Sequence, residues 1–140
     1  MFRTILVTTD FSANSAVAVR PAIEIARQFK GRIVLVHALE GASPDPAVVA
    51  VDLAPLAAIT KEQLQDFGTR EIGNRAPWTA EVMFGPAYVA ITDAAAKHHA
   101  DLIVVATHGR TGLLHLLLGS VAERVARTAI CPVLTVRVPG

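Results

Sequence analysis

Glycines and polar side chains gather in the segment Ala106–Ser120, and their spacing suits the binding of an anion. Glycines in a connection from a strand to a helix let the backbone approach a ligand closely. Gly119 and Ser120 at the start of a helix would add N–H groups and the positive end of the helix dipole, which together favour phosphate. The Ser120 hydroxyl and the Arg110 guanidinium are further donors for the same anion. The alternative is that Ser120 caps its own helix and Gly112 turns the chain.

Asp10 stands directly after the first apolar run, where a carboxylate could serve the same ligand. It could accept a hydrogen bond from a ribose hydroxyl, or help to hold Mg²⁺ beside phosphate groups. The alternative is purely local, with Asp10 as the cap of a helix that begins near Ser12. The residues alone leave both interpretations open.

The other chemically interesting residues form no catalytic or metal-binding set. The sequence has no Walker phosphate loop, no G-x-G-x-x-G fingerprint between a strand and a helix, and no G-x-S-x-G nucleophile elbow. His98 and His99 are adjacent and would diverge on a helix, so we expect a solvated helix end there. His37 lies in an aliphatic strand and is predicted to be a hydrogen-bonded core residue, while Cys131 is predicted to pack rather than react. These residues therefore predict no catalytic constellation.

Five aliphatic runs predict β-strands, and most of them lack the alternation of a half-exposed strand. Continuous Val, Ile and Leu residues, as at positions 33–36 and 102–105, are typical of strands buried on both faces. The predicted strands are Thr4–Thr8, Arg32–Leu39, Thr79–Phe84, Asp101–Ala106 and Val133–Val138. The third of these has the weakest and most alternating pattern.

Apolar residues at helical spacing fill the gaps between the strands. The predicted helices run from Ala16 to Phe29, from Leu56 to Ile72, from Pro86 to His98 and, behind Gly119 and Ser120, from Val121 to Ala126. Pro21 is expected to kink the first helix or to delay its start, because proline lacks a backbone donor. Gly68 is expected to interrupt the second helix, and Pro86 is expected to be the first residue of the third.

Strands that alternate with helices predict right-handed crossovers and a parallel sheet covered by helices on both faces. The chain is therefore predicted to be a doubly wound α/β protein, with residues 1–140 as one domain, since about 150 residues per domain is typical. Such sheets bind ligands outside the carboxyl ends of their strands, where the strand order reverses. Asp10, Ala38 and the segment Ala106–Ser120 lie at or just after the carboxyl ends of strands, so we expect them to meet at this edge.

The composition excludes several classes of protein. Thirteen Lys and Arg residues against twelve Asp and Glu give a formal charge of +1, which offers no electrostatic footprint for nucleic acid or an anionic membrane. No apolar run reaches the roughly 18 residues of a membrane span, and no signal segment is expected. The single cysteine cannot form an intramolecular disulfide. We expect a cytoplasmic protein.

Several motifs along the chain are distinctive in combination. They are Ile5-Leu-Val-Thr-Thr-Asp-Phe-Ser12, Val34-Leu-Val-His-Ala38, Thr107-His-Gly-Arg-Thr-Gly112, Gly119-Ser-Val-Ala-Glu-Arg-Val125 and Cys131-Pro-Val-Leu-Thr-Val-Arg137. With these motifs the whole chain resembles the universal stress protein family. The resemblance implies a five-stranded parallel sheet of order 3-2-1-4-5, and a homodimer built along the last strand, Val133–Val138.

Members of that family that bind ATP carry the motif G-x2-G-x9-G-[ST]. Gly109 and the pair Gly119 and Ser120 match it, whereas Ala106 stands where the first glycine is expected. The added methyl group can point away if Ala106 has a negative φ, but it would be strained at a positive φ. The resemblance implies an ATP-binding stress-response regulator or nucleotide sensor. The substitution supports the alternative, a dimeric interaction module that binds no nucleotide.

Carried over to this sequence, the resemblance implies a set of ATP-binding positions. Ala38 would meet adenine through its backbone, Asp10 would lie near the base and ribose, and residues 119–122 would hold the phosphates with backbone amides. The predicted positions are Thr8, Thr9, Asp10, Ala38, Val105, Ala106, Gly109, Arg110, Gly119, Ser120, Val121 and Ala122. Such a site would hold ATP, with or without Mg²⁺, but would not position an attacking water, so any hydrolysis should be slow.

Overall fold

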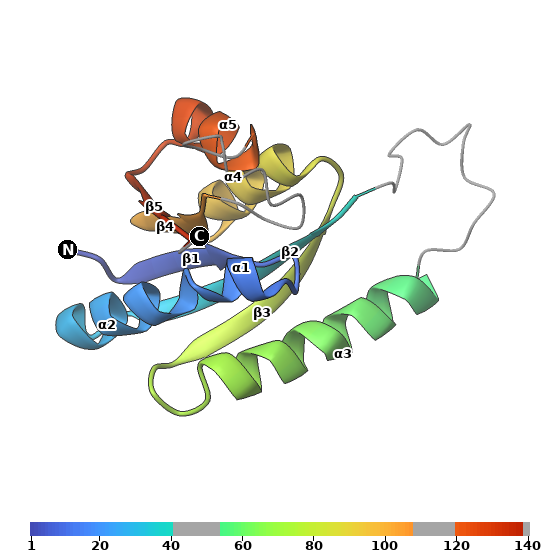
Figure 1. The fold of residues 1–140 in the computed structure, drawn as a ribbon, viewed down its shortest axis with the longest axis horizontal. Helices are drawn as coiled ribbons and strands as arrows, with labels where there is room; N and C mark the ends of the chain where they lie inside the picture. Colours follow the sequence, from blue (N-terminus) through green and yellow to red (C-terminus); the bar gives the residue numbers. More distant parts are fainter. Residues whose placement is uncertain (41–53, 108–119, 139–140) are drawn as a thin grey trace.

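The computed structural model describes residues 1–40, 54–107 and 120–138, and the strands in these ranges form one parallel sheet (Figure 1). The elements in chain order are β1 (Thr4–Thr8), α1 (Ala13–Ala16), α2 (Val19–Phe29), β2 (Arg32–Leu39), α3 (Ala54–Glu71), β3 (Trp78–Phe84), α4 (Ala87–Lys97), β4 (Leu102–Ala106), α5 (Ser120–Thr128) and β5 (Val133–Val136). The strand order is β3-β2-β1-β4-β5, and β1 pairs with both β2 and β4. The predicted doubly wound α/β fold of order 3-2-1-4-5 is confirmed.

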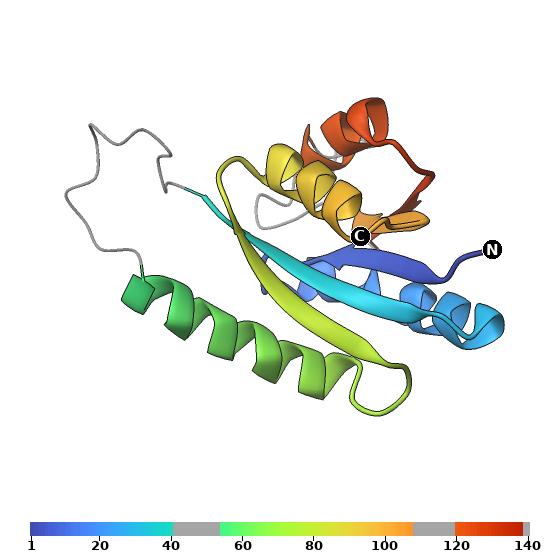
Figure 2. The same cartoon turned by 180° about the vertical axis from the view of Figure 1, so that it is seen from behind.

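Helices cover both faces of the sheet, with α1, α2 and α3 on one side and α4 and α5 on the other (Figure 2). Alternate residues of the strands supply the two sides. Ile5 and Val7 of β1 belong to the core cluster under α2 and α3, whereas Leu6 belongs to the cluster under α4 and α5. Burial on both faces explains the continuous aliphatic runs. Cys131 packs partly buried against the second cluster, as predicted, and burial raises the pKa of its thiol.

The predicted strand limits agree with the structure to within two residues. β1 and β2 have the predicted bounds, β3 and β4 each differ by one residue at the start, and β5 ends at Val136 instead of Val138. Asp101 precedes β4 and does not belong to it. Its carboxylate accepts hydrogen bonds from the backbone amides of Arg3 (2.9 Å) and Thr4 (3.0 Å), and so fixes the start of β1 beside the turn that leads into β4.

Two prolines stand at helix starts. Pro21 is the third residue of α2, which begins only after a break behind α1, so the predicted delayed start is correct. Proline is tolerated there because the first amides of a helix have no partner within it. Pro86 is the N-cap of α4 with an extended ψ of 139°, so the helix begins at Ala87. The prediction that Pro86 is the first helical residue is wrong, and α4 ends at Lys97 with His98 as its C-cap.

Gly68 does not interrupt α3, which runs unbroken from Ala54 to Glu71. A methyl group at this position would lie 2.3 Å from the ring of Trp78, which packs across the helix. The ring is fixed in place because its Nε1 donates a hydrogen bond to the carbonyl oxygen of Gly73 at 3.0 Å. The glycine therefore meets a packing requirement of the contact between α3 and β3.

The C-terminal end of α4 is tied to the sheet through a three-residue cluster. His98 and Lys97 both contact the carboxylate of Glu81 on β3, and the side chains of Glu81 and His98 are only 21% and 22% exposed. The expectation of a solvated helix end is therefore wrong for His98, because the docking of α4 on the sheet carries it over β3. His99 is exposed, with a left-handed φ of 52°.

Candidate functional site

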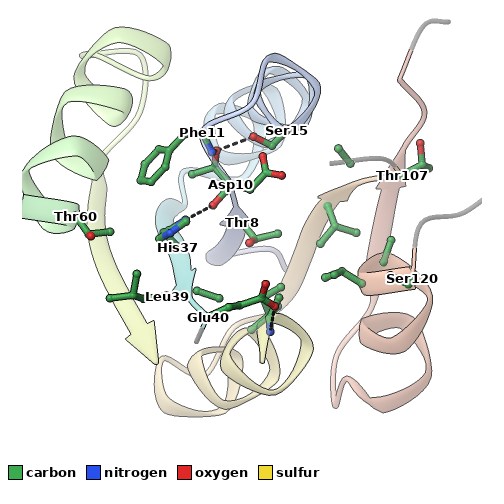
Figure 3. A pocket seen from close by; sticks show the side chains of 18 of the residues that line it. Thr8, Asp10, Phe11, Ser15, His37, Leu39, Glu40, Thr60, Thr107 and Ser120 are labelled. Atoms are coloured by element: carbon green, nitrogen blue, oxygen red, sulfur yellow. Dashed lines mark hydrogen bonds between the residues drawn. The ribbon is translucent and has the colours of Figure 1, made fainter. Parts of the chain in front are cut away.

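A cavity of about 540 Å³ opens at the carboxyl edge of the sheet, beyond the ends of β1, β2 and β4 (Figure 3). The chain runs outward from β1 to β2 and β3 on one side and later returns to β4 on the other, so this is the point where the strand order reverses. Ligands of doubly wound sheets bind at such a point. The topology thus places the cavity where the sequence predicts a site.

Nine of the twelve predicted ATP-binding residues line this cavity. They are Thr8, Thr9, Asp10, Ala38, Val105, Ala106, Ser120, Val121 and Ala122. The other three, Gly109, Arg110 and Gly119, lie outside the described residues. The structure therefore brings together residues from four separate parts of the chain, and their role in binding a nucleotide stays a prediction.

The turn after β1 is built by its own hydrogen bonds. The amide of Thr9 donates to the carbonyl oxygen of Val36 (3.0 Å), which holds the turn against β2. The hydroxyl of Thr9 accepts a hydrogen bond from the amide of Phe11 (3.0 Å) and pairs with the hydroxyl of Ser15 (2.7 Å). Phe11 has a φ of 69°, a conformation that non-glycine residues seldom adopt. These bonds hold Asp10, between Thr9 and Phe11, in a fixed position at the cavity.

Asp10 supports a helix cap without being the cap itself. Its Oδ1 accepts hydrogen bonds from the amide of Ser12 (3.0 Å) and from the Ser12 hydroxyl. Ser12 is the N-cap of α1, and its side chain accepts from the amide of Ser15 at 3.1 Å. The interpretation of Asp10 as the helix cap is wrong, because Ser12 already fills that place. The carboxylate is half-buried and lines the cavity.

His37 faces the cavity rather than the core. Its Nδ1 lies 2.8 Å from the carbonyl oxygen of Thr9, and since a carbonyl only accepts, Nδ1 carries the proton of this bond. Its ring stacks on Phe11, with ring centres 4.3 Å apart and planes 28° apart. The predicted hydrogen bond is confirmed, but the predicted core position is wrong, because His37 is half-buried at the carboxyl end of β2.

One wall of the cavity consists of residues that are not among the predicted ATP-binding positions. It consists of Phe11, His37, Leu39, Glu40, Thr60 and Gln63, with Ala87 and Ile91 of α4 nearby. Leu39 and Glu40 directly follow the predicted Ala38, so the edge rule for parallel sheets could have included them. Thr60 and Gln63 carry no such signal, because only the docking of α3 against the sheet brings them to the cavity.

Ala106 is accommodated without backbone strain. It is the last residue of β4, where it pairs with Val136, and it is not among the described residues with positive φ. It lines the cavity and also packs, partly buried, against the core cluster under α2 and α3. Of the two cases that the sequence leaves open, the structure shows the unstrained one.

The opposite wall is formed by the first turn of α5. This helix begins at Ser120, and its first residues Ser120, Val121 and Ala122 line the cavity. The amides of a first helical turn have no acceptor within the helix and point outward along its axis. Thr107 continues this wall from the end of β4, where its amide donates to the carbonyl oxygen of Val136 at 2.9 Å. The first-turn amides of α5, unlike the engaged amide of Thr107, are donors of the kind that suits an anionic group.

In the ranges that the structure describes, no three His, Cys, Asp or Glu side chains lie where they could share a metal ion. No helix in the same ranges has the length and apolar character needed to cross a membrane.

The fold and the cavity define a doubly wound α/β protein whose candidate site lies at the reversal of strand order. The model of the universal stress protein family matches residues 1–137, and the chain belongs to this family. It is 35% identical to universal stress protein MJ0531 of Methanocaldococcus jannaschii, over 99% of this chain and 84% of that protein.

Solved structures share the fold over nearly the whole chain. Hypothetical protein MJ0577 superposes with a TM-score of 0.81 at 24% identity, over 100% of this chain and 99% of that one. A universal stress protein in complex with cAMP superposes with a TM-score of 0.70 at 27% identity, over 99% of this chain and 98% of that one.

Proposed function

We propose that the protein binds ATP in the cavity at the carboxyl edge of the sheet, and that it acts as a nucleotide sensor or regulator in a stress response. The observation that carries this proposal is the convergence of nine predicted ATP-binding residues on one cavity of about 540 Å³. A volume of this order suits a small ligand of nucleotide size. A relative of the same fold forms a complex with cAMP, which supports a nucleotide as the ligand.

In the proposed complex, each wall of the cavity serves one part of the nucleotide. The backbone at Ala38 would meet the base, and Asp10 would accept from a ribose hydroxyl or help to hold Mg²⁺. The amides of Ser120, Val121 and Ala122 would hold phosphate oxygens, because the first turn of α5 offers donors and a positive dipole end. Base, ribose and phosphate would thus follow the carboxyl edge from β2 to α5.

We further propose that bound ATP is retained rather than rapidly hydrolysed. Asp10, the proposed ribose contact, lines the cavity, and its Oδ1 is already engaged by the amide and hydroxyl of Ser12. A carboxylate held in this way is poorly placed to take a proton from an attacking water. Retention of the ligand is what a sensor requires.

Calorimetric titration of the protein with Mg·ATP, with GTP, AMP and cAMP as comparators, tests the proposal. Saturable binding selective for adenine nucleotides is the expected result. In a thermal-shift experiment a hundredfold excess over the dissociation constant should stabilise the fold by about 2.7 kcal/mol. No binding at millimolar nucleotide would contradict the proposal and favour the module that binds no nucleotide.

A test substitution and a matched control probe the predicted phosphate end. Gly119→Leu should abolish ATP binding, because a side chain would stand where the resemblance places the close approach of phosphate. Ala126→Leu introduces the same side chain at an exposed position of α5 that does not line the cavity. This variant should bind ATP as the wild type does. Equal affinity of all three proteins would refute the assignment of the phosphate end.

We also propose that the protein is a homodimer built along β5. This strand lies at one edge of the sheet, so one row of its backbone donors and acceptors has no neighbouring strand in the described part of the chain. Two apolar side chains on or near this strand are exposed: Leu134 of β5 is 37% exposed, and Ile130, three residues before the strand, is 78% exposed. An exposed apolar edge strand is a surface that proteins normally cover.

A further inference from the structure

Glu40 binds the beginning of a helix that is distant in sequence. Its Oε1 accepts a hydrogen bond from the amide of Ala87 at 2.9 Å, across 47 residues of chain (Figure 3). Ala87 is the first residue of α4, an eleven-residue helix whose N-cap, Pro86, offers no side-chain acceptor. The carboxylate at the end of β2 therefore supplies the acceptor that the helix itself lacks.

This contact lies on the wall of the proposed nucleotide site. Glu40, Ala87 and Ile91 all line the cavity, at the corner where the end of β2 meets α4. The N-terminus of a helix attracts anions, and at this corner an anion of the chain itself is already bound. Of the Asp, Glu, Lys and Arg residues in the described ranges, only Asp10 and Glu40 line the cavity, and both are acidic.

The α5 wall differs in this respect. The acidic residue of its first turn, Glu123, is half-exposed and pairs with Arg127 at 2.7 Å on the same helix. Glu123 does not line the cavity. The first turn of α5 therefore presents its own residues Ser120, Val121 and Ala122 to the cavity. At the first turn of α4, by contrast, the Glu40 carboxylate from the end of β2 binds the amide of Ala87.

We propose that Glu40 is a specificity-determining residue that lowers the affinity for a nucleotide as the negative charge of the nucleotide increases. Its carboxylate keeps phosphate away from the start of α4, directs it to α5, and disfavours each added negative charge on the ligand. The site then favours nucleotides of low charge, or ATP whose charge Mg²⁺ has reduced. This inference rests on the proposed function, because it requires that a nucleotide occupies the cavity.

Glu40→Gln tests the role of the charge and keeps an oxygen that can accept from Ala87. Affinities for adenosine, AMP and ATP are measured by calorimetry in magnesium-free buffer of low ionic strength. The substitution should leave adenosine unchanged, strengthen AMP binding about twofold and strengthen ATP binding about fivefold, because the removed repulsion grows with ligand charge. Adding Mg²⁺ should reduce the gain for ATP. Glu24→Gln removes the same charge from an exposed site on α2 that does not line the cavity, and should change none of the three affinities.

The outcomes separate this inference from the proposed function. A purely structural role for Glu40 would change the three affinities by the same factor, or by none, and either result would overturn the inference alone. Failure of the wild type and of Glu40→Gln to bind any of the three compounds would overturn the proposed function and the inference with it. Glu40→Ala removes the charge and also the acceptor, so it should show the same order of gains with a lower melting temperature.

Discussion

Ala106 replaces the first glycine of the family's ATP-binding motif, and its methyl group could affect ATP binding. The residue ends β4 without a positive φ, and it packs partly buried against the cluster under α2 and α3. Ala106→Gly should therefore leave the dissociation constant for Mg·ATP within about twofold of the wild type. It should also lower the free energy of unfolding by about 0.5–1 kcal/mol, because glycine within a strand costs backbone entropy. Calorimetry and urea unfolding measure the two effects, and a tenfold gain in ATP affinity would show that the methyl group obstructs the site.

Single residues also show where prediction from the sequence ends. Asp10 and Ala38 could be placed at the cavity because Asp10 follows one recognisable aliphatic strand and Ala38 lies at the carboxyl end of another. The aliphatic neighbours of His37 in the strand predict a core position, whereas the end of β2 turns its side chain toward the cavity. Gly68 predicts a helix break, since nothing in the sequence reveals that Trp78 lies over it. Both errors concern contacts between elements, which local patterns do not encode.

At the scale of elements, the cluster of Glu81, Lys97 and His98 joins the edge strand β3 to the end of α4. Burial alone would raise the pKa of Glu81, but hydrogen bonds and charge from His98 and Lys97 outweigh it, so the pKa is lowered from 4.5. A carboxyl group whose pKa falls on folding stabilises the fold above its unfolded pKa. This stabilisation is lost as the pH falls through the lower folded pKa.

Glu81→Gln should consequently destabilise the protein by about 1 kcal/mol at neutral pH, where the carboxylate is ionised in both folded and unfolded states. The difference from the wild type should persist down to about pH 5 and shrink below it. Urea unfolding across this pH range measures it. Glu71→Gln removes a carboxylate from an exposed pair with Arg70, whose side chain is 65% exposed, and should change stability little. A difference for Glu81→Gln that grows toward acid pH would contradict the assignment.

The accuracy of element prediction follows burial only in part. β1 and β2 lie inside the sheet and match their predicted bounds, whereas β4, which is also interior, begins one residue later than predicted. β3, with its alternating pattern, is an edge strand that is exposed in part, and its start was predicted one residue late. The late start of α2 agrees with one of the two expectations from Pro21, whereas α4 begins one residue later than predicted. A proline's fixed φ suits the N-cap as well as the first helical turn, so the position of Pro86 depended on its ψ.

At the scale of the whole molecule, the order of the strands determines both the site and the free edge. Placing β1 in the middle of the sheet brings the ends of β1, β2 and β4 together at the cavity and leaves β3 and β5 at the margins. This order was expected from the resemblance, and the alternation of strands and helices alone would have allowed others. The contribution of Thr60 and Gln63 of α3 could not be expected, because it depends on how a helix with little sequence signal docks.

The edge at β5 leads to a prediction about assembly. Leu134 lies on this strand and is 37% exposed, so a lysine in its place would add a charge to the proposed interface without burying that charge in the monomer. Leu134→Lys should convert the dimer to a monomer at micromolar concentration, because an unpaired charge in an apolar interface costs several kcal/mol, on the order of the buried-charge penalty. Sedimentation velocity measures the change. Ile59→Lys, at a 56% exposed position of α3, should remain dimeric. A wild type that sediments as a monomer, or a Leu134→Lys protein that stays dimeric, would remove β5 as the dimer interface.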